Sequence, residues 1–303
     1  MTGRVFRRAL VGLGLLAAGG FSWGVLEARA FTVRQVSVPV LAAGASPLRV
    51  LHLSDIHLLS RQRLKQRFVA SLAGWQPDLV VNTGDNIAST DALDPLLGSL
   101  GPLLDVPGVF VFGSNDYCAP SFTNPLGYLL HGKSEASHTS TEPNLPWRSM
   151  RDAFARRGWT DLTHRRTVLD IAGTTIEFRG TDDAHLNRDD YAAVAGPPRP
   201  GIDLSIGVTH APYLRLLDAM TTDGVDLIMA GHTHGGQVCL PVKGALITNC
   251  DLDTDRVKGL STHSADGCTA YLHVSAGIGG SPFAPYRTFC RPEATLLTLV
   301  PRD

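Results

Sequence analysis

The sequence predicts an α/β fold built around a mainly parallel, buried β-sheet. Short apolar runs alternate with longer amphipathic stretches, and this alternation is typical of βαβ units. The 31 glycines and 19 prolines supply the many turns that such a fold needs. Strands are expected at residues 32–40, 48–53, 78–81, 108–112, 167–171, 175–179, 203–208, 225–230, 237–240, 245–248, 270–275 and 294–300, with helices at 61–75, at 92–104 and from Pro212 onward.

The composition is that of a folded chain of 303 residues, long enough to bury a full core. It is 44% hydrophobic and 18% charged, and its formal net charge is −1. These values exclude a disordered or collagen-like chain. The absence of a basic excess gives no reason to expect a nucleic-acid surface.

The first thirty residues predict a membrane-targeting segment. Arg4, Arg7 and Arg8 precede an uncharged apolar run at 9–26, close to the roughly 20 residues that span a bilayer. Ala28-Arg29-Ala30 has the small-x-small form of a signal-peptide cleavage site, so the sequence allows either a signal-anchor or a cleaved signal peptide. Basic residues ahead of the run place the N-terminus inside. We therefore expect residues 31–303 on the extracytoplasmic side of the cell membrane, or exported after cleavage near Ala30.

Two other features concern loops and cysteines. Residues 121–146 are rich in Ser, Thr, Pro and Asn and have little periodicity, which predicts a long surface loop inserted in the domain. The five cysteines match no zinc motif. A Cys239–Cys250 disulfide and five small buried thiols are equally compatible with the sequence.

Polar side chains follow five of the predicted strands. Because the carboxyl ends of parallel strands meet at one edge of a sheet, these side chains are expected to converge. Carboxylates and imidazoles without thiolates suit Mn, Fe or Zn. Four imidazoles and two carboxylates are too many for one tetrahedral ion and suffice for two ions, if one carboxylate bridges. In chain order the strong ligands are Asp55, His57, Asp85, His210, His232 and His234.

The ordered motifs resemble those of the calcineurin-like metallophosphoesterases, over about residues 48–275. The similarity is greatest to the bacterial membrane-associated, phosphodiesterase-like branch of that family. The motifs are Asp55-x-His57, Gly84-Asp85, Gly113-x-Asn115, His210 and Gly231-His232-x-His234.

The resemblance implies a four-layer αββα sandwich of two mixed sheets flanked by helices, following the N-terminal membrane segment. It also implies two divalent metal ions. Asp85 would bridge them, and a hydroxide held between them would attack phosphorus in line. The implied ligands are Asp55, His57 and His234 for the first ion, and His210, His232 and Asn115 for the second.

One segment departs from the family pattern. The family reads Gly-Asn-His-Asp/Glu, where this chain reads Gly113-Ser114-Asn115-Asp116. Aligned without a gap, Ser114 replaces the ligand and Asn115 replaces the leaving-group acid. Shifted by one residue, Asn115 remains the ligand and Asp116 takes the place of histidine. We favour the shifted alignment because an amide oxygen is a better ligand than a neutral hydroxyl, so Asp85, Asn115 and Asp116 are the predicted catalytic residues.

Other histidines are candidates for the missing acid or for structural roles. His185, His131 and His138 are candidates to replace the family histidine. His52 lies within the first buried strand, which predicts a buried, hydrogen-bonded side chain. His164, His263 and His273 are expected to be structural.

The expected function is hydrolysis of a phosphodiester or of a lipid-linked envelope phosphate ester. The expected partners are the phosphoester substrate and the membrane. The alternative is a metal-binding module whose catalysis is weak or lost, because Ser114-Asn115-Asp116 replaces the usual Asn-His motif. A further alternative is an extracytoplasmic scaffold with structural metals.

Overall fold

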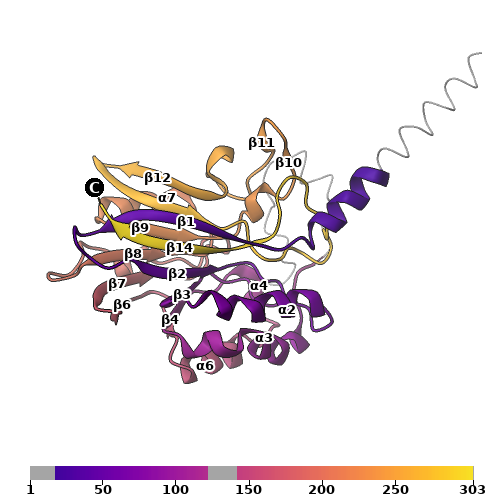
Figure 1. Cartoon of the computed structure of the whole chain (residues 1–303), viewed down its shortest axis with the longest axis horizontal. Coiled ribbons are helices and arrows are strands. Elements are labelled where there is room, and N and C mark those ends of the chain that lie inside the picture. The colour runs from indigo at the N-terminus through magenta and orange to yellow at the C-terminus, as the bar shows by residue number, and fades with distance from the viewer. Residues whose placement is uncertain (1–17, 122–141, 303) are drawn as a thin grey trace, which may run out of the picture.

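Two six-stranded β-sheets form the body of the protein in a computed structural model that describes residues 18–121 and 142–302 (Figure 1). The order in the first sheet is β1 (Thr32–Leu41), β14 (Glu293–Pro301), β2 (Leu48–Leu53), β3 (Leu79–Asn82), β4 (Gly108–Phe110) and β5 (Thr160–Asp161). The order in the second sheet is β12 (Gly259–Ala265), β13 (Cys268–Val274), β9 (Leu227–Ala230), β8 (Leu204–Val208), β7 (Thr174–Gly180) and β6 (Arg165–Ile171). A separate hairpin contains β10 (Cys239–Leu240) and β11 (Gly244–Ala245).

Both sheets are mixed, with parallel strands where the site is built. β2, β3, β4 and β5 pair in parallel in the first sheet, and β14 joins β2 antiparallel. In the second sheet β13, β9, β8 and β7 are parallel, whereas β12 and β6 pair antiparallel at the edges. The strands predicted at 167–171 and 175–179 form a hairpin, β6–β7. Most strand pairs are therefore parallel, as predicted. The antiparallel pairs are β14–β2 inside the first sheet and the two edge pairs of the second sheet.

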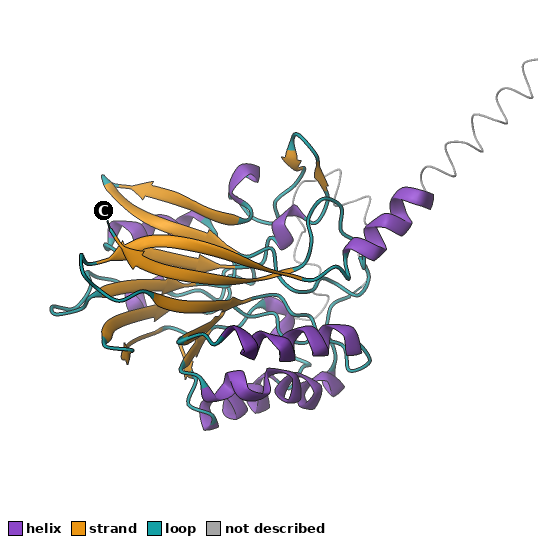
Figure 2. Cartoon of the chain, viewed as in Figure 1, coloured by secondary structure: helices purple, strands orange, loops and turns teal. Residues whose placement is uncertain are grey.

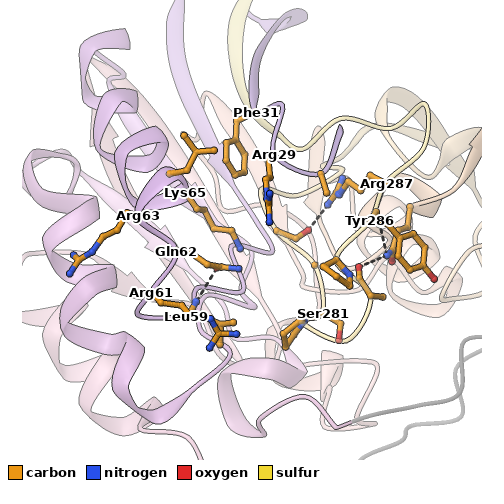
Figure 3. Close-up of a pocket in the computed structure, with 18 residues that line it drawn as sticks. Arg29, Phe31, Leu59, Arg61, Gln62, Arg63, Lys65, Ser281, Tyr286 and Arg287 are labelled. Atoms are coloured by element: carbon orange, nitrogen blue, oxygen red, sulfur yellow. Dashed lines mark hydrogen bonds between the residues drawn. The ribbon is translucent and has the colours of Figure 1, made fainter. Parts of the chain in front are cut away.

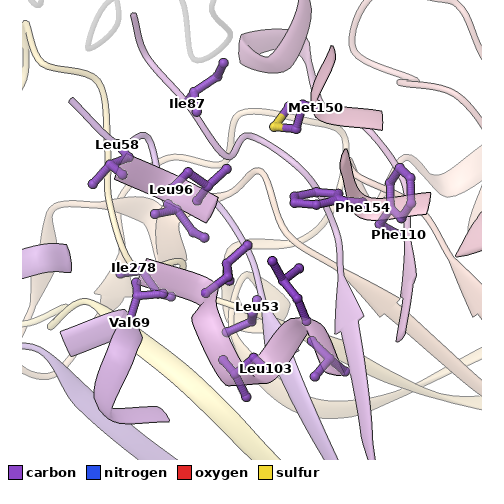
Figure 4. Close-up of a cluster of buried hydrophobic side chains, with 14 of the residues drawn as sticks. Leu53, Leu58, Val69, Ile87, Leu96, Leu103, Phe110, Met150, Phe154 and Ile278 are labelled. Carbon is purple, nitrogen blue, oxygen red and sulfur yellow. The ribbon is translucent and has the colours of Figure 1, made fainter. Parts of the chain in front are cut away.

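Helices cover the outer faces of the two sheets (Figure 2). On the first sheet, α2 (Arg63–Ser71), α3 (Leu93–Leu100) and α6 (Trp147–Arg156) pack against strand side chains such as Leu53 and Phe110 (Figure 4). On the second sheet, α7 (Leu214–Thr222) packs against β9 and β13. The short helices are α4 (Ser114–Tyr117) and the 3-10 turns Leu72–Trp75, Thr90–Ala92, Gly101–Asp105, Tyr191–Val194, His234–Gly236 and Thr254–Arg256.

An apolar core also lies between the two sheets, in addition to those beneath the helices. It is formed by buried aliphatic side chains from both, including Val50 and Val81 from the first sheet and Ile206 and Met229 from the second. Strands buried on both faces explain the nearly continuous apolar runs in the sequence. The resulting order is helices, sheet, sheet, helix, as the family resemblance implies.

Two elements of seven residues or more, α6 and β12, are absent from the sequence prediction. α6 presents only a narrow apolar stripe, Met150, Ala153 and Phe154, among arginines and other polar residues. β12 is an edge strand in which only His263 is buried, so it lacks the apolar run of a central strand. Both elements form because neighbouring strands and helices cover one face of them.

The N-terminal and loop predictions fall largely outside the described residues. Residues 18–27 are helical, but residues 9–17 of the predicted apolar run and residues 122–141 of the predicted loop are not described. No helix within 18–121 and 142–302 combines the length and the apolar character that crossing a membrane requires. All five cysteines are thiols, so the structure contains no Cys239–Cys250 disulfide.

Candidate metal centre

The predicted ligands lie at the carboxyl ends of four parallel strands. Asp55 and Asp85 follow β2 and β3, which are neighbours in the first sheet, whereas His210 and His232 follow β8 and β9 in the second. Backbone hydrogen bonds join successive loops: Asp55 N–H donates to the Gly84 carbonyl at 2.9 Å. The site is therefore assembled from both sheets, as strand-end convergence predicts.

The first ligand cluster contains Asp55, His57 and His234, with one ligand atom of each within 4.8 Å of the others. Asp55 Oδ1 lies 3.8 Å from His57 Nε2 and 3.7 Å from His234 Nε2. Asp55 Oδ1 and both ring nitrogens of His57 are buried and make no hydrogen bond in the described structure. Leaving a buried polar group unsatisfied costs about 1–3 kcal/mol, and a cation at this point would satisfy Asp55 and His57 together.

The second cluster contains Asp55, Asp85 and His210. His210 Nδ1 lies 2.7 Å from the Thr83 carbonyl, and His232 Nε2 lies 3.2 Å from the Asn249 carbonyl. A carbonyl only accepts, so these two nitrogens carry the protons.

The other ring nitrogen of each of these two histidines then holds a lone pair. These nitrogens, His210 Nε2 and His232 Nδ1, face each other at 3.3 Å. Two lone pairs repel unless a proton or a metal ion lies between them. Backbone carbonyls that fix the tautomer in this way are typical of metal-binding histidines. His232 therefore belongs with the second cluster.

Asp85, a member of the second cluster, lies between a histidine of the first cluster and a histidine of the second. Its Oδ2 atom is 3.3 Å from His57 Nε2 and 3.5 Å from His210 Nε2. Burial favours the neutral acid, but His210 outweighs it, helped by its hydrogen bond and by His57, and holds the pKa of Asp85 well below its usual range. A carboxylate that stays ionised and faces two imidazole groups is suited to bridging two cations.

The pKa values of His210 and His234 shift in opposite directions. Burial opposes a charge on His210, but Asp85 outweighs it and raises the pKa of His210 well above its usual value. Burial lowers the pKa of His234 to about 4, against the opposing effect of Asp55. A proton on His210 thus occupies the place of a cation, and metal binding would release it.

The ligand backbones are strained. Five of the six strong ligands have positive φ angles, and His210 is the exception. Non-glycine residues rarely occupy this region, and each costs of the order of 1–3 kcal/mol. Such strain concentrates at functional sites. The five are Asp55 (49°), His57 (43°), Asp85 (57°), His232 (69°) and His234 (49°).

The Gly113-Ser114-Asn115-Asp116 segment packs against Asp85. Asn115 donates its backbone N–H to Asp85 Oδ1 at 2.7 Å and its side-chain amide to Asp85 Oδ2 at 2.9 Å. Gly113 permits this approach, because a Cβ there would lie 2.5 Å from His210 Cε1. The structure thus brings Asn115 to the bridging carboxylate, and its role as a metal ligand stays a prediction.

Asp116 does not have the geometry of a leaving-group acid. Its carboxylate is completely buried and accepts backbone N–H groups from Asp85 at 2.8 Å, Asn86 at 2.7 Å and Gly113 at 3.0 Å. The expectation that Asp116 replaces the family histidine is therefore corrected: the residue caps α4 and fixes the Asp85 loop. Sequence reasoning placed it wrongly because the capping pattern is visible only once the two loops meet.

His185 is the candidate replacement that reaches the site. Its ring centre lies 4.5 Å from that of His232, and its Nδ1 is 3.2 Å from the Tyr213 hydroxyl. His131 and His138 lie outside the described residues. The prediction for His52 is confirmed, since its buried ring contacts His273 at 2.9 Å.

Several supporting residues had no sequence signal. The Ser54 hydroxyl donates to Asp55 and receives a 2.7 Å hydrogen bond from Thr83. Arg287, distant in sequence, donates to the His234 carbonyl at 3.4 Å. Ser54 and Thr83 directly precede the Asp55-x-His57 and Gly84-Asp85 motifs, whereas no motif lies near Arg287.

Two mixed sheets flanked by helices, with paired carboxylate–imidazole clusters at their strand ends, define a metallophosphoesterase-type site. The family model described as calcineurin-like phosphoesterase matches residues 48–236, more than half of the chain. The protein therefore belongs to the calcineurin-like phosphoesterases, as the motifs predict. It is a hydrolase acting on phosphoester bonds, in a family that uses a dinuclear divalent metal centre.

Similar proteins include bacterial and vertebrate relatives. The uncharacterized metallophosphoesterase YkuE of Bacillus subtilis is 26% identical over 308 residues, covering 96% of this chain and 93% of that protein. The phosphodiesterase YaeI of Escherichia coli is 27% identical over 264 residues, covering 84% and 83%. A transmembrane protein with a metallophosphoesterase domain from Danio rerio is 28% identical over 243 residues, covering 77% of this chain and 51% of its own.

Proposed function

We propose that the protein hydrolyses a phosphodiester or a lipid-linked phosphate ester with two divalent metal ions. The observation that carries the proposal is the position of Asp85, whose Oδ2 atom lies within 3.5 Å of an imidazole nitrogen from each cluster. Asp55, His57 and His234 would hold one ion, and His210 and His232 the other. The similarity to a named phosphodiesterase supports a diester as the substrate class.

Each chain residue has a defined part in this proposal. The bound ions would supply Lewis-acid stabilisation of the charge on the phosphoryl oxygens. Asn115 orients Asp85 through two hydrogen bonds, and Asp116 holds the Asp85 loop in place. His185, beside His232, is the group placed to donate a proton to the leaving oxygen.

The competing function is a metal-binding module with little catalysis. The observation that favours it is the amide at Asn115, where the ungapped alignment places the family histidine. An amide cannot protonate a leaving alkoxide, whereas general acid help is worth about 10²–10⁴ in rate.

An assay with bis-p-nitrophenyl phosphate and added Mn²⁺ distinguishes the two functions. We expect turnover by the intact chain and near-complete loss in Asp85→Asn, with two Mn²⁺ per chain by elemental analysis. His185→Ala should slow alkyl esters far more than nitrophenyl esters, because nitrophenolate is already a stable anion. Two bound ions with no turnover of any ester would favour the binding module, and one ion or fewer would refute the dinuclear centre.

We also propose that the catalytic domain lies outside the cell membrane. Arg4, Arg7 and Arg8 ahead of the apolar run support this topology. A periplasm-dependent reporter fused after Asp303 should be active. A cytoplasm-dependent reporter that is active at the same point would overturn the topology, and release of the protein in soluble form would show cleavage near Ala30.

A further inference from the structure

A cavity of about 670 Å³ lies beside the metal centre, between the segment 28–31 that follows the helical residues 18–27, the start of α2 and the loop 279–287 (Figure 3). None of the six strong metal ligands lines it. Its lining includes five cationic side chains and no carboxylate. The cations are Arg29, Arg61, Arg63, Lys65 and Arg287.

Two of these groups, Lys65 and Arg287, are buried without a carboxylate partner. Burial, together with Arg287, lowers the pKa of Lys65 to about 7. The Cys290 thiol lies 4.0 Å from the Arg287 guanidinium, and its hydrogen bond with Cys239 lowers the pKa of Cys290 to about 6. Lys65 is 6% exposed, and its ammonium donates to the Ile56 carbonyl at 2.7 Å and the His57 carbonyl at 3.0 Å. Arg287 is 3% exposed and donates to the Gly279 and His234 carbonyls. Among the described residues neither side chain forms an ion pair with a carboxylate.

A buried charge normally has a counter-charge, because desolvating an isolated ion is expensive. The Lys65 ammonium has three donors, and two of them are used by carbonyls. Figure 3 shows Arg29, Lys65 and Arg287 reaching toward the middle of the cavity from three different segments. This arrangement is complementary to a compact anion such as a phosphate group.

The surroundings of the cavity are apolar and exposed. Phe31, Leu59 and Pro285 line it. The large exposed apolar side chains of the described residues lie on the same few segments: helix 18–27, the start of α2, the β10–β11 hairpin and the loop 281–289. They are Phe21, Trp23, Leu26, Leu64, Leu240, Val242, Leu246, Phe283 and Phe289.

Contacts between these segments make them one surface. Phe21 packs on Tyr286 with ring centres 6.0 Å apart, and the Arg287 N–H donates to the Gly24 carbonyl at 2.9 Å. The Cys239 N–H donates to the Thr288 carbonyl at 2.8 Å, which brings in the hairpin. Contiguous exposed apolar surface marks a site of association, and aromatic side chains with nearby cations suit the interfacial region of a bilayer.

We propose that the cavity binds the phosphate headgroup of an anionic phospholipid, with the acyl chains directed toward the exposed apolar side chains. The occupant is a membrane lipid because the same surface carries helix 18–27, and the sequence that precedes this helix continues its apolar run back to residue 9. The cationic floor matches the headgroup charge, and the apolar rim matches the glycerol backbone and the acyl chains. The domain is thereby held against the bilayer by a lipid site separate from the metal centre.

The test uses the full chain in neutral detergent, with calorimetric titration of three probes: dioctanoyl-phosphatidylglycerol, dioctanoyl-phosphatidylcholine and inorganic phosphate. We expect the anionic lipid to bind at least tenfold more tightly than either of the others. In the double variant Arg29→Gln/Arg63→Gln its affinity should fall about 30-fold, at about fivefold per cation near a lipid surface. Arg29→Lys/Arg63→Lys should retain binding.

The matched control is Arg148→Gln/Arg156→Gln on α6, where both arginines are exposed and outside the cavity; its lipid affinity should be unchanged. Hydrolysis of bis-p-nitrophenyl phosphate should also be unchanged in both glutamine double variants. Equal binding of both lipids, or loss of affinity in the control, would overturn the proposal. Inorganic phosphate binding as tightly as the anionic lipid would show a free-anion site and overturn it as well, and so would the absence of binding to any probe.

Discussion

The contact between Asn115 and Asp85 gives the most direct test of how the metal centre is held. The Asn115 side-chain amide donates to Asp85 Oδ2 at 2.9 Å, and its backbone N–H donates to Oδ1 at 2.7 Å. Asn115→Ala removes the first hydrogen bond and keeps the second. The substitution therefore loosens the bridging carboxylate without deleting a strong ligand.

The size of the effect follows from the charge on the acceptor. A hydrogen bond to a charged group contributes about 1.5–3 kcal/mol, which corresponds to about 10- to 150-fold in an equilibrium constant. Because Asp85 Oδ2 faces both His57 and His210, affinity for both ions should fall. Activity at limiting Mn²⁺ should drop by this factor and return as Mn²⁺ is raised.

Calorimetric titration of the metal-free protein with Mn²⁺, beside activity at several Mn²⁺ concentrations, measures both effects. Ser114→Ala is the matched control, since the Ser114 hydroxyl makes only a 3.3 Å contact with the Asn115 amide; it should change affinity less than threefold, as expected for a weak contact. The reasoning is wrong if Asn115→Ala leaves Mn²⁺ affinity intact and lowers only the rate at saturating metal. It is also wrong if Ser114→Ala empties the second site while Asn115→Ala does not, because the ungapped alignment would then describe the ligands.

Three further outcomes follow from packing and protonation. Asp116→Asn should lower the melting temperature and the Mn²⁺ affinity together, because an amide has one acceptor where the carboxylate has two; a change confined to alkyl-ester turnover would restore its role as an acid. Gly231→Ala should abolish metal binding, since the added Cβ would collide with Ser54 and lie 2.5 Å from Asp55 Oδ2; crystallisation with both ions in place would disprove this. Burial lowers the pKa of His273 to about 4, below roughly 6.5 in the unfolded chain, so its neutral form stabilises the fold above pH 6.5 and this contribution is lost as pH falls. Because of His273, the free energy of unfolding should be about 2 kcal/mol lower at pH 5 than at pH 8. Urea unfolding of His273→Gln should show a smaller change in this free energy between the two pH values. The same change as in the unaltered protein would contradict the assignment.

The six strong ligands could be predicted from sequence because each follows one of four buried strands within two to four residues. The strand is a local pattern, and the convergence of strand ends is a general property of parallel sheets. For the same reason the positions of the central strands could be predicted from the apolar runs. The information needed was contained in short segments.

The remaining features depend on contacts between distant segments. The Thr83 and Asn249 carbonyls fix the tautomers of His210 and His232, but any residue can offer a carbonyl, so nothing in the sequence marks those two positions. Asp116 was misassigned because the N–H groups that it accepts belong to another loop.

The strained ligand backbones explain how this chain can lack the family histidine and still retain its ligand clusters. Backbone hydrogen bonds between loops, such as His57 N–H to the Asp85 carbonyl at 2.9 Å and Gly231 N–H to the His210 carbonyl at 2.8 Å, hold the ligands in these conformations. The segment that follows β4 contributes through Asp116, whose carboxylate accepts hydrogen bonds from backbone N–H groups. None of these contacts requires a histidine at Asn115. Loss of the family histidine is therefore expected to alter which leaving groups are accepted while the metal centre persists, whereas loss of the Asn115 amide weakens metal binding through Asp85.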